Sequence, residues 1–265
     1  MKLFTQTSGE GPDLVLVHGW GLHAGIWDPL VPLLEPCFRV TRVDLPGHGR
    51  SAWRGQADLD ATADAVLAVA PSAAAWLGWS LGGLVAAQAA LAAPDRVRQL
   101  VLLASTPSFV RRPGWQSAML PALLDTFAAD LEADYSGTLN RFLSLQVRGS
   151  EDGSAVLRTL RAKLLEHGEP ALSALRAYLA VLRSTDLRDR LSTFRCPVLL
   201  LMGERDTLVP AAAGRQAAQL IPGARLQVIA DAGHAPFLVH PRAVATALQG
   251  FLQPLNTPCA GQGHG

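Results

Sequence analysis

Six short apolar runs, separated by stretches of helical composition, limit the folds open to this chain more than any other feature. The runs are rich in valine, leucine and isoleucine and fall at 14–17, 40–43, 75–79, 100–103, 198–202 and 226–229. Continuous rather than alternating apolar runs are typical of a parallel sheet that is covered on both faces. Alanine- and leucine-rich stretches with helical spacing lie between them, at 59–70, 81–92, 211–220 and 243–252. The alternation predicts an α/β fold with a mostly parallel, doubly covered sheet.

The alternation stops between Thr106 and about Arg190, where Pro107, Pro113 and Pro121 punctuate stretches of helical composition. We interpret this segment as a helical cap over the end of the sheet, with helices expected near 139–147, 155–166 and 171–182. The last ten residues are rich in glycine and polar side chains, which indicates a disordered tail. The predicted organisation is a core at 1–106 and 191–255, a cap at 107–190 and a tail at 256–265.

Composition and charge exclude several classes of protein. With 49% hydrophobic and 17% charged residues, the chain is typical of a folded globular protein rather than a disordered one. A net charge of +1 gives no basic footprint for nucleic acid. Ser80, Gly82, Gly83 and Gln88 interrupt the most apolar stretch, 76–93, which favours a buried strand and helix over a membrane span.

The first residues lack the apolar run of a secretory signal. The odd number of cysteines, Cys37, Cys196 and Cys259, favours reduced thiols over a disulfide framework. We therefore expect a cytoplasmic protein that binds neither nucleic acid nor membrane. We also expect a monomer.

A candidate nucleophile lies between an apolar strand and an alanine-rich helix. Gly78-Trp79-Ser80-Leu81-Gly82 fits G-x-S-x-G in the strand–turn–helix setting that a nucleophile elbow requires. The tight turn lifts the Ser80 hydroxyl clear of the sheet, and the glycines leave room where strand and helix cross. The alternative is a glycine-rich turn with an ordinary serine, but the setting favours the elbow.

A serine hydroxyl needs a base within hydrogen-bond reach, and His234 is the best candidate. It follows the last apolar run in a loop of small residues, Ala232-Gly233-His234-Ala235. The other histidines favour surface or structural roles: His23, His48, His167, His240 and His264, with His18 expected to brace the loop after the first apolar run.

The acid that orients the base should follow a strand and lie between Ser80 and His234 in the chain. Asp206 satisfies both conditions, and Glu204 and Asp231 are its rivals. Asp231 is only three residues from His234 and fits a turn or supporting role better.

Backbone N–H groups of Leu81 and Trp20 are the candidate donors to an oxyanion. Leu81 opens the helix after the serine, and Trp20 lies in the His18-Gly19-Trp20-Gly21 loop after an early strand. The Trp20 indole would wall a pocket suited to an acyl chain. No metal-ligand spacing, phosphate-binding loop or dinucleotide fingerprint is present in the sequence, so we expect chemistry without a metal or cofactor.

Six segments spread over nearly the whole chain carry a family resemblance. They are HGWGL at 18–22, VDLPGHGRS at 43–51, WLGWSLGGLV at 76–85, RFLSLQ at 141–146, DLR at 186–188 and HAPF at 234–237. With them the chain resembles the pimeloyl-[acyl-carrier protein] methyl ester esterases of biotin synthesis, in the α/β-hydrolase superfamily. Most telling are Trp20, Trp79 and the cap segment 141–146, since caps set substrate choice in this fold. Arg111, Arg112 and residues 150–153 follow no pattern of the family.

The resemblance implies a serine carboxylesterase with Ser80, Asp206 and His234 as catalytic triad and Trp20 and Leu81 as oxyanion donors. It also implies a substrate channel lined by Trp20 and a run of cap residues, Phe142, Leu143, Ser144, Leu145 and Gln146. The implied reaction removes methanol from a pimeloyl methyl ester carried on acyl-carrier protein, which is the implied partner.

Cationic residues near the channel could bind such a carrier, which is typically acidic. From 141 to 163 the chain has five basic and two acidic residues. Arg141 and Arg148, and Arg158 and Arg161, have spacings that place each pair on one helix face, so these four are candidate docking residues. A solvated polar face is the alternative interpretation.

Two other functions fit the same residues. Another serine hydrolase, such as a broad short-chain carboxylesterase, a carbon–carbon bond hydrolase or a cofactor-free haloperoxidase, would share the triad. A non-catalytic binding protein on this scaffold is a more remote alternative, because such proteins lack a triad member and all three are present here.

Overall fold

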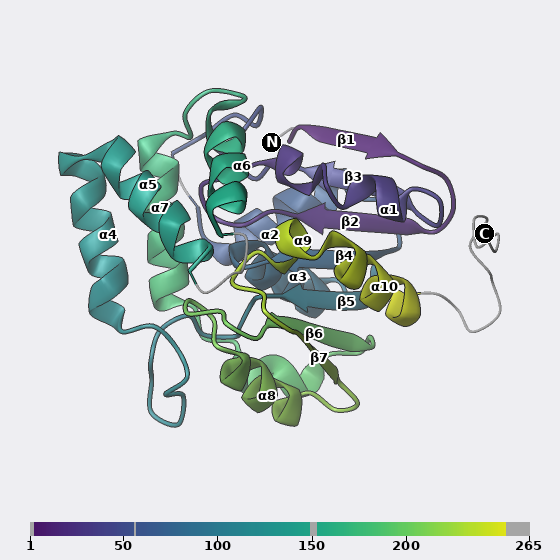
Figure 1. Cartoon of the computed structure of the whole chain (residues 1–265). Helices are drawn as coiled ribbons and strands as arrows, with labels where there is room; N and C mark the ends of the chain where they lie inside the picture. The colour runs from purple at the N-terminus through teal and green to yellow at the C-terminus, as the bar shows by residue number, and fades with distance from the viewer. Residues whose placement is uncertain (1–2, 56, 149–152, 253–265) are drawn as a thin grey trace.

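A seven-stranded sheet forms the centre of the computed structural model, which describes residues 3–55, 57–148 and 153–252 (Figure 1). The strand order is β1-β3-β2-β4-β5-β6-β7. The strands are β1 (Thr5–Ser8), β2 (Asp13–Val17), β3 (Arg39–Val43), β4 (Ala74–Trp79), β5 (Val97–Leu103), β6 (Val198–Gly203) and β7 (Arg225–Ile229). β1 pairs antiparallel with β3, and every other neighbouring pair is parallel. The predicted α/β class is confirmed.

Each of the six apolar runs forms a strand of this sheet. All residues of β4 and β6 are buried, as expected for strands covered on both faces. β1 was not predicted, because Thr5-Gln6-Thr7-Ser8 is a polar edge strand with no apolar pattern.

Helices cover both faces of the sheet, and the four predicted for the core are confirmed. They are α2 (Leu59–Val69), α3 (Leu81–Ala92), α8 (Ala211–Leu220) and α10 (Pro241–Leu252). In Figure 1, α10 lies in front of the sheet, and α2 and α3 lie behind it. Four short helices were not predicted: η1 (Ala24–Trp27), α1 (Val31–Leu34), η2 (Arg188–Thr193) and α9 (Pro236–Val239).

The apolar stretch 76–93 divides into β4 and α3, as predicted. Within the described ranges, none of the helices combines the length and apolar character needed to cross a bilayer.

Four helices between β5 and β6 gather at one end of the sheet (Figure 1), and we call them the cap. They are α4 (Pro121–Ala133), α5 (Tyr135–Gln146), α6 (Gly153–Leu165) and α7 (Leu172–Ser184). Three were predicted within a few residues. α4 was missed because Pro121 was interpreted as a break, whereas it occupies the first turn of a helix, where its missing N–H costs no hydrogen bond. The assignment of core and cap as separate domains stays a prediction, and the predicted tail lies outside the described residues.

The cysteines differ from the expectation of reduced thiols in one case. Cys37 takes part in a disulfide. Cys196 is a free, half-buried thiol, and burial raises its pKa to about 11. Cys259 lies outside the described residues.

Candidate functional site

Ser80 lies in a strained turn between β4 and α3. It has φ 55° and ψ −120°, a backbone conformation that residues other than glycine rarely adopt. Close packing explains the two flanking glycines: a Cβ at Gly78 would lie 2.1 Å from the Gly82 carbonyl oxygen, and one at Gly82 would lie 2.2 Å from that of Val17. The structure thus has the geometry that the G-x-S-x-G pattern predicted.

A continuous chain of hydrogen bonds joins Ser80, His234 and Asp206. The Ser80 Oγ lies 2.9 Å from His234 Nε2, and His234 Nδ1 lies 2.8 Å from Asp206 Oδ2. All three residues are at most 5% exposed. The sheet brings them together because Ser80 follows β4, Asp206 follows β6 and His234 follows β7, and parallel strands end at one edge.

Backbone contacts hold both the acid and the base in place. Asp206 Oδ1 accepts hydrogen bonds from the N–H groups of Leu208 and Val209, at 2.8 and 2.9 Å, which leaves Oδ2 for His234. The backbone N–H of His234 donates to the Gln146 carbonyl at 3.0 Å, and the Trp79 indole N–H donates to the His234 carbonyl at 2.7 Å. Sequence reasoning missed these positioning roles of Trp79 and Gln146, because pairs this distant in the chain leave no local pattern.

The two rival carboxylates lie elsewhere. Asp231 is paired with Arg205 at the surface, and Glu204 accepts a hydrogen bond from the Asp231 N–H at 3.1 Å. The carboxylates of Asp231 and Glu204 thus bind groups of each other's loops, whereas the carboxylate of Asp206 contacts the His234 imidazole.

The candidate oxyanion donors lie on either side of the serine. Leu81 is the first residue of α3, so its N–H lies at a helix N-terminus, where the helix dipole favours negative charge. The Trp20 loop lies close to the serine, since a Cβ at Gly19 would be 3.3 Å from the Ser80 Cβ. The Trp20 indole donates to the Leu175 carbonyl of α7 at 2.9 Å, which ties this loop to the cap.

The five cap residues predicted to line the channel, 142–146, all lie on α5, but only some of them are on its buried side. Phe142, Leu143 and Gln146 are buried, and the Phe142 ring meets the Trp20 ring edge-on at 4.6 Å. The Gln146 Oε1 is buried without a hydrogen-bond partner among the described residues. Ser144 is exposed and Leu145 half-buried, because a helix turns successive residues to different faces.

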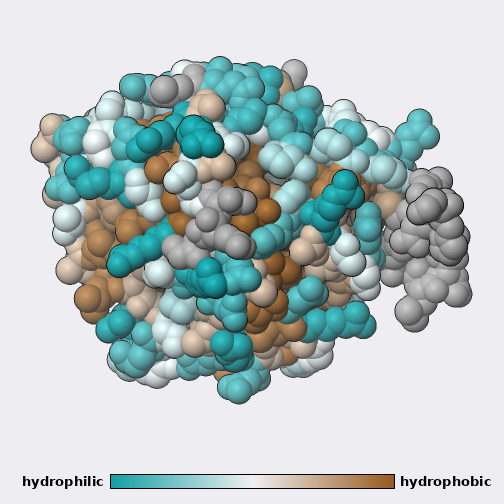
Figure 2. All heavy atoms as spheres, viewed as in Figure 1, coloured by the Kyte–Doolittle hydropathy of each residue, from teal (hydrophilic) through white to brown (hydrophobic). Residues whose placement is uncertain are grey.

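Ser144 and Leu145 instead line a groove of about 530 Å³ between α4 and α5. Leu123 and Phe127 form its apolar wall, and Figure 2 shows apolar surface over α4. The Phe127 ring meets that of Phe142 at 5.8 Å. A row of aromatic rings therefore connects this outer groove with the Trp20 loop.

His18 and His48 are fully buried within hydrogen-bonding distance of the Trp20 loop. Burial lowers the pKa of each to about 3, with smaller contributions from His23 to both and from His18 to His48. His18 thus lies where the sequence predicted, against the loop, and both rings are neutral near neutral pH. The His167 ring lies 4.5 Å from that of His23 between centroids, and His240 ends α9. His264 lies outside the described residues.

These two buried imidazoles make stability depend on pH. In the unfolded chain a histidine has its ordinary pKa of 6.5, whereas in the folded protein the pKa of each of these two is about 3. Between these values the unfolded chain binds more protons than the folded protein. The unfolding free energy is therefore highest above pH 6.5 and falls as the pH decreases toward 3. Each histidine should contribute a slope of up to about 1.4 kcal/mol per pH unit to the unfolding free energy in this window.

Urea unfolding at several pH values checks this expectation. His48→Gln should lower the slope of the unfolding free energy against pH by about 1.4 kcal/mol per pH unit, the contribution of one proton. Thr62→Val removes a buried hydroxyl that does not titrate, so it should leave this slope unchanged. Equal slopes for His48→Gln and the original protein would contradict it.

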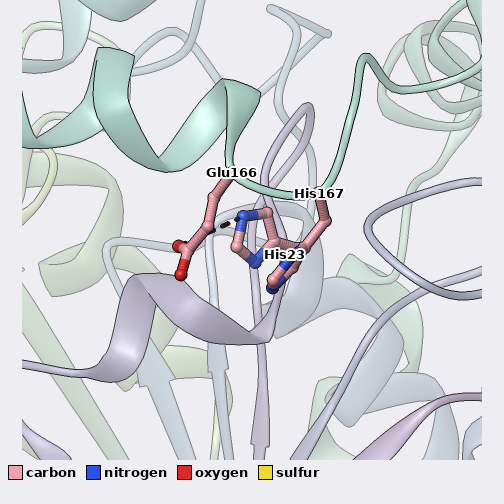
Figure 3. Close-up of side chains that lie close together, drawn as sticks. All are labelled: His23, Glu166 and His167. Atoms are coloured by element: carbon pink, nitrogen blue, oxygen red, sulfur yellow. Dashed lines mark ion pairs between the residues drawn. The ribbon is translucent and has the colours of Figure 1, made fainter.

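Folding also gathers His23, Glu166 and His167, whose potential metal-ligating atoms lie within 4.8 Å of one another (Figure 3). The ligating atoms of His23 and Glu166 already have partners. His23 Nδ1 accepts from the Gly25 N–H at 3.0 Å, so its Nε2 carries the proton, which it donates to the Lys163 carbonyl at 2.6 Å. The Lys163 ammonium lies 2.7 Å from Glu166 Oε2 and 2.5 Å from Asp28 Oδ2. The cluster therefore anchors α6 to η1, and an ion would have to displace an ammonium already in place.

Comparison with known proteins agrees with this geometry. The family model of the alpha/beta hydrolase fold matches residues 12–241. A pimeloyl-[acyl-carrier protein] methyl ester esterase from Nitrosomonas europaea is 47% identical over 240 residues, 91% of this chain and 95% of the relative. One from Stenotrophomonas maltophilia is 47% identical over 256 residues, covering 96% and 98%. An esterase from Exiguobacterium antarcticum has the same fold, with a TM-score of 0.87 at 23% identity over 95% of this chain and 96% of that one. The chain therefore belongs to the pimeloyl-[acyl-carrier protein] methyl ester esterase family of α/β hydrolases.

Proposed function

We propose that the chain hydrolyses the methyl ester of a pimeloyl group carried on acyl-carrier protein, with Ser80 as nucleophile, His234 as base and Asp206 as orienting acid. The single observation that carries this proposal is the Ser80–His234–Asp206 hydrogen-bond chain at the strand ends. The names of relatives 44–47% identical over most of the chain supply the substrate. The further role in biotin synthesis rests on the sequence resemblance.

The reaction proceeds in two balanced halves. Ser80 Oγ attacks the ester carbonyl while His234 Nε2 takes the hydroxyl proton, which gives a tetrahedral intermediate whose negative charge lies on the former carbonyl oxygen. The carbon–oxygen bond to the methoxy group then breaks, and His234 returns the proton, so that methanol leaves and Ser80 is acylated. Water repeats the attack with His234 as base, and the pimeloyl carboxyl group and free Ser80 are released.

Backbone N–H groups of Leu81 and Trp20 are the proposed donors to the intermediate. The strained Ser80 turn precedes the N-terminus of α3, and the Trp20 loop lies against Ser80. Donors fixed before the reaction stabilise charge that develops only in the transition state.

The acyl chain is proposed to lie along the buried side of α5. Trp20, Phe142 and Leu143 offer apolar surface there, and the Gln146 Oε1 supplies an acceptor still without a partner among the described residues. A saturated acyl chain gains about 25 cal/mol for each Å² of apolar surface that it buries in such surroundings.

Carrier binding is proposed to use cap arginines that have no carboxylate partner within the described part of the chain. Arg141 is ion-paired with Asp130 and Asp134. In contrast, Arg148 and Arg158 are exposed and have no ion pair among the described residues. Within the same residues, the side chain of Arg161 donates to the neutral Asn140 Oδ1 and pairs with no carboxylate. Glu151 and Asp152, the acidic residues of this stretch, lie outside the described residues.

Reversing these charges should impair the carrier-bound substrate selectively. For Arg158→Glu combined with Arg161→Glu, we expect the KM for the carrier-bound ester to rise several-fold, about tenfold at low salt, because electrostatic steering is lost. Hydrolysis of a short p-nitrophenyl ester should change by less than about twofold, since that substrate is uncharged.

The matched control is Arg98→Glu combined with Arg225→Glu, which makes the same charge change. These two arginines lie at the N-terminal ends of β5 and β7, whereas the triad residues follow the C-terminal ends of their strands. It should leave both substrates unaffected. Equal losses in the two double variants would reject this face of the cap as the docking surface.

Methanol release tests the function itself. Purified protein should release methanol from methyl pimeloyl-acyl-carrier protein with a kcat/KM well above that for a panel of simple short-chain esters. A preference for the simple esters would indicate the broad carboxylesterase instead. A cytoplasmic location and a monomeric state complete the proposal, and sedimentation of the purified chain tests the latter.

A further inference from the structure

Each of the two peptide groups flanking Trp20 is held by a buried histidine. The Gly19 carbonyl lies 2.8 Å from His18 Nδ1, and the Gly21 N–H donates to His48 Nε2 at 3.2 Å. Both imidazoles are fully buried, and their ring centroids lie 5.3 Å apart. The backbone on either side of the proposed oxyanion donor is thereby fixed by side chains.

The neighbouring hydrogen bonds determine both tautomers. The Leu45 N–H donates to His18 Nε2 at 2.9 Å, so the proton of His18 is on Nδ1 and is donated to the Gly19 carbonyl. Because His48 Nε2 accepts from Gly21, its proton is on Nδ1 and is donated to the Pro46 carbonyl at 3.1 Å. Each ring therefore links the Trp20 loop to the segment that follows β3.

The first contact sets the direction of the Trp20 N–H. In a trans peptide the C=O and the N–H point in opposite directions, so a bond that holds the Gly19 carbonyl at His18 turns the Trp20 N–H the other way. The same bond polarises the amide and makes its N–H a stronger donor.

The second contact fixes the peptide that follows. Gly21 has φ 77°, a left-handed conformation in which the loop reverses, and its N–H is bonded to His48. The Trp20 indole, bonded to Leu175, ties down the side chain between the two peptides. Without an acceptor at His48, the peptide after Trp20 could rotate about the Trp20 Cα, and the Gly19–His18 bond alone would hold the backbone that carries the Trp20 N–H.

We propose that His48 is a positioning residue for catalysis: by accepting the Gly21 N–H it keeps the Trp20 N–H, whose direction the His18 contact sets, in place at the developing oxyanion. The inference rests on the proposed function, because it presumes a tetrahedral intermediate at Ser80. It assigns a role to a histidine for which the sequence favoured a surface or structural place.

A pair of substitutions separates the acceptor from the ring. His48→Gln keeps an acceptor oxygen near the Nε2 position, whereas His48→Leu keeps bulk and loses the acceptor. Removal of a whole oxyanion donor costs about 10²–10³ in kcat, so we expect His48→Leu to lower kcat on a p-nitrophenyl ester by about tenfold or more. KM should change by less than about twofold, and His48→Gln should recover most of the loss.

The inhibition constant of a transition-state analogue distinguishes a positioning role of His48 from a purely structural one, which would leave this constant unchanged. A trifluoromethyl ketone forms a tetrahedral oxyanion with the serine, so its inhibition constant should rise in His48→Leu by the same factor as kcat/KM falls. The control is Thr62→Val, which removes a buried hydroxyl within hydrogen-bonding distance of Tyr178, the ring beside His48. It should lower stability and leave kcat and inhibition unchanged.

Three results would overturn the inference. The first is a kcat and an inhibition constant in His48→Leu within about twofold of the original. The second is His48→Gln as impaired as His48→Leu. The third is an original protein that hydrolyses no ester, which would overturn the proposed function as well. If His48→Leu does not fold, His48→Asn replaces it, because the shorter amide cannot reach Gly21.

Discussion

Replacing Ser80 by alanine should leave a folded protein whose esterase activity is reduced by about a thousandfold or more, since the attacking oxygen is lost while the oxyanion donors remain. The substitution removes one oxygen from a residue with φ 55°, and alanine is no more strained there than serine. Stability should therefore change little. Steady-state hydrolysis of a p-nitrophenyl ester measures the loss.

Covalent labelling provides the control for this variant. A fluorophosphonate that reacts with activated serines should label the original protein and not Ser80→Ala. The Ser105 hydroxyl, which donates to the Ser80 carbonyl at 2.8 Å, serves as a neighbouring hydroxyl, and Ser105→Ala should still be labelled. Near-normal turnover by Ser80→Ala would remove this residue from the mechanism.

Replacing Asp206 by asparagine should cost up to about 10⁴ in kcat, because the amide no longer favours the imidazole tautomer that accepts the serine proton. Oδ2 lies 2.8 Å from His234 Nδ1, and an NH₂ group there would leave the proton on the wrong nitrogen. The Oδ1 bonds to Leu208 and Val209 can persist, so the loop should keep its conformation.

Asp231→Asn is the matched control, because Asp231 lies three residues from His234 but is paired with Arg205 at the surface. We expect its kcat within about threefold of the original, as is usual for a surface substitution. If the two variants rank in the opposite order, the acid has been misassigned.

The sequence predicted those parts of the fold that rest on local patterns. Buried parallel strands are continuous apolar runs, and all six were found at their positions. β1 could not be predicted in this way, because its backbone pairing with β3 requires no apolar side chains. α4 was missed because proline ends a helix in its interior but starts one at its first turn.

The candidate site divides in the same way. Ser80, Asp206 and His234 each follow an apolar run, and strand order brings such residues to one edge of the sheet. The contacts that hold the site are distant in sequence: Trp79 and His234 are 155 residues apart, and so are Trp20 and Leu175. No spacing rule covers such pairs, so the contacts of Trp79 and Gln146 with His234, and the role proposed for His48, needed the folded structure.

The intact mass of the carrier tests the central claim most directly. After incubation of methyl pimeloyl-acyl-carrier protein with the original protein in ¹⁸O-labelled water, the carrier should keep its pimeloyl thioester, lose the methyl group and gain one labelled oxygen in the freed carboxyl group. Ser80→Ala should leave the mass unchanged over the same time. A carrier that loses the whole acyl group would show thioester hydrolysis, and an unchanged mass with the original protein would show no hydrolysis of this substrate; either result would contradict the account.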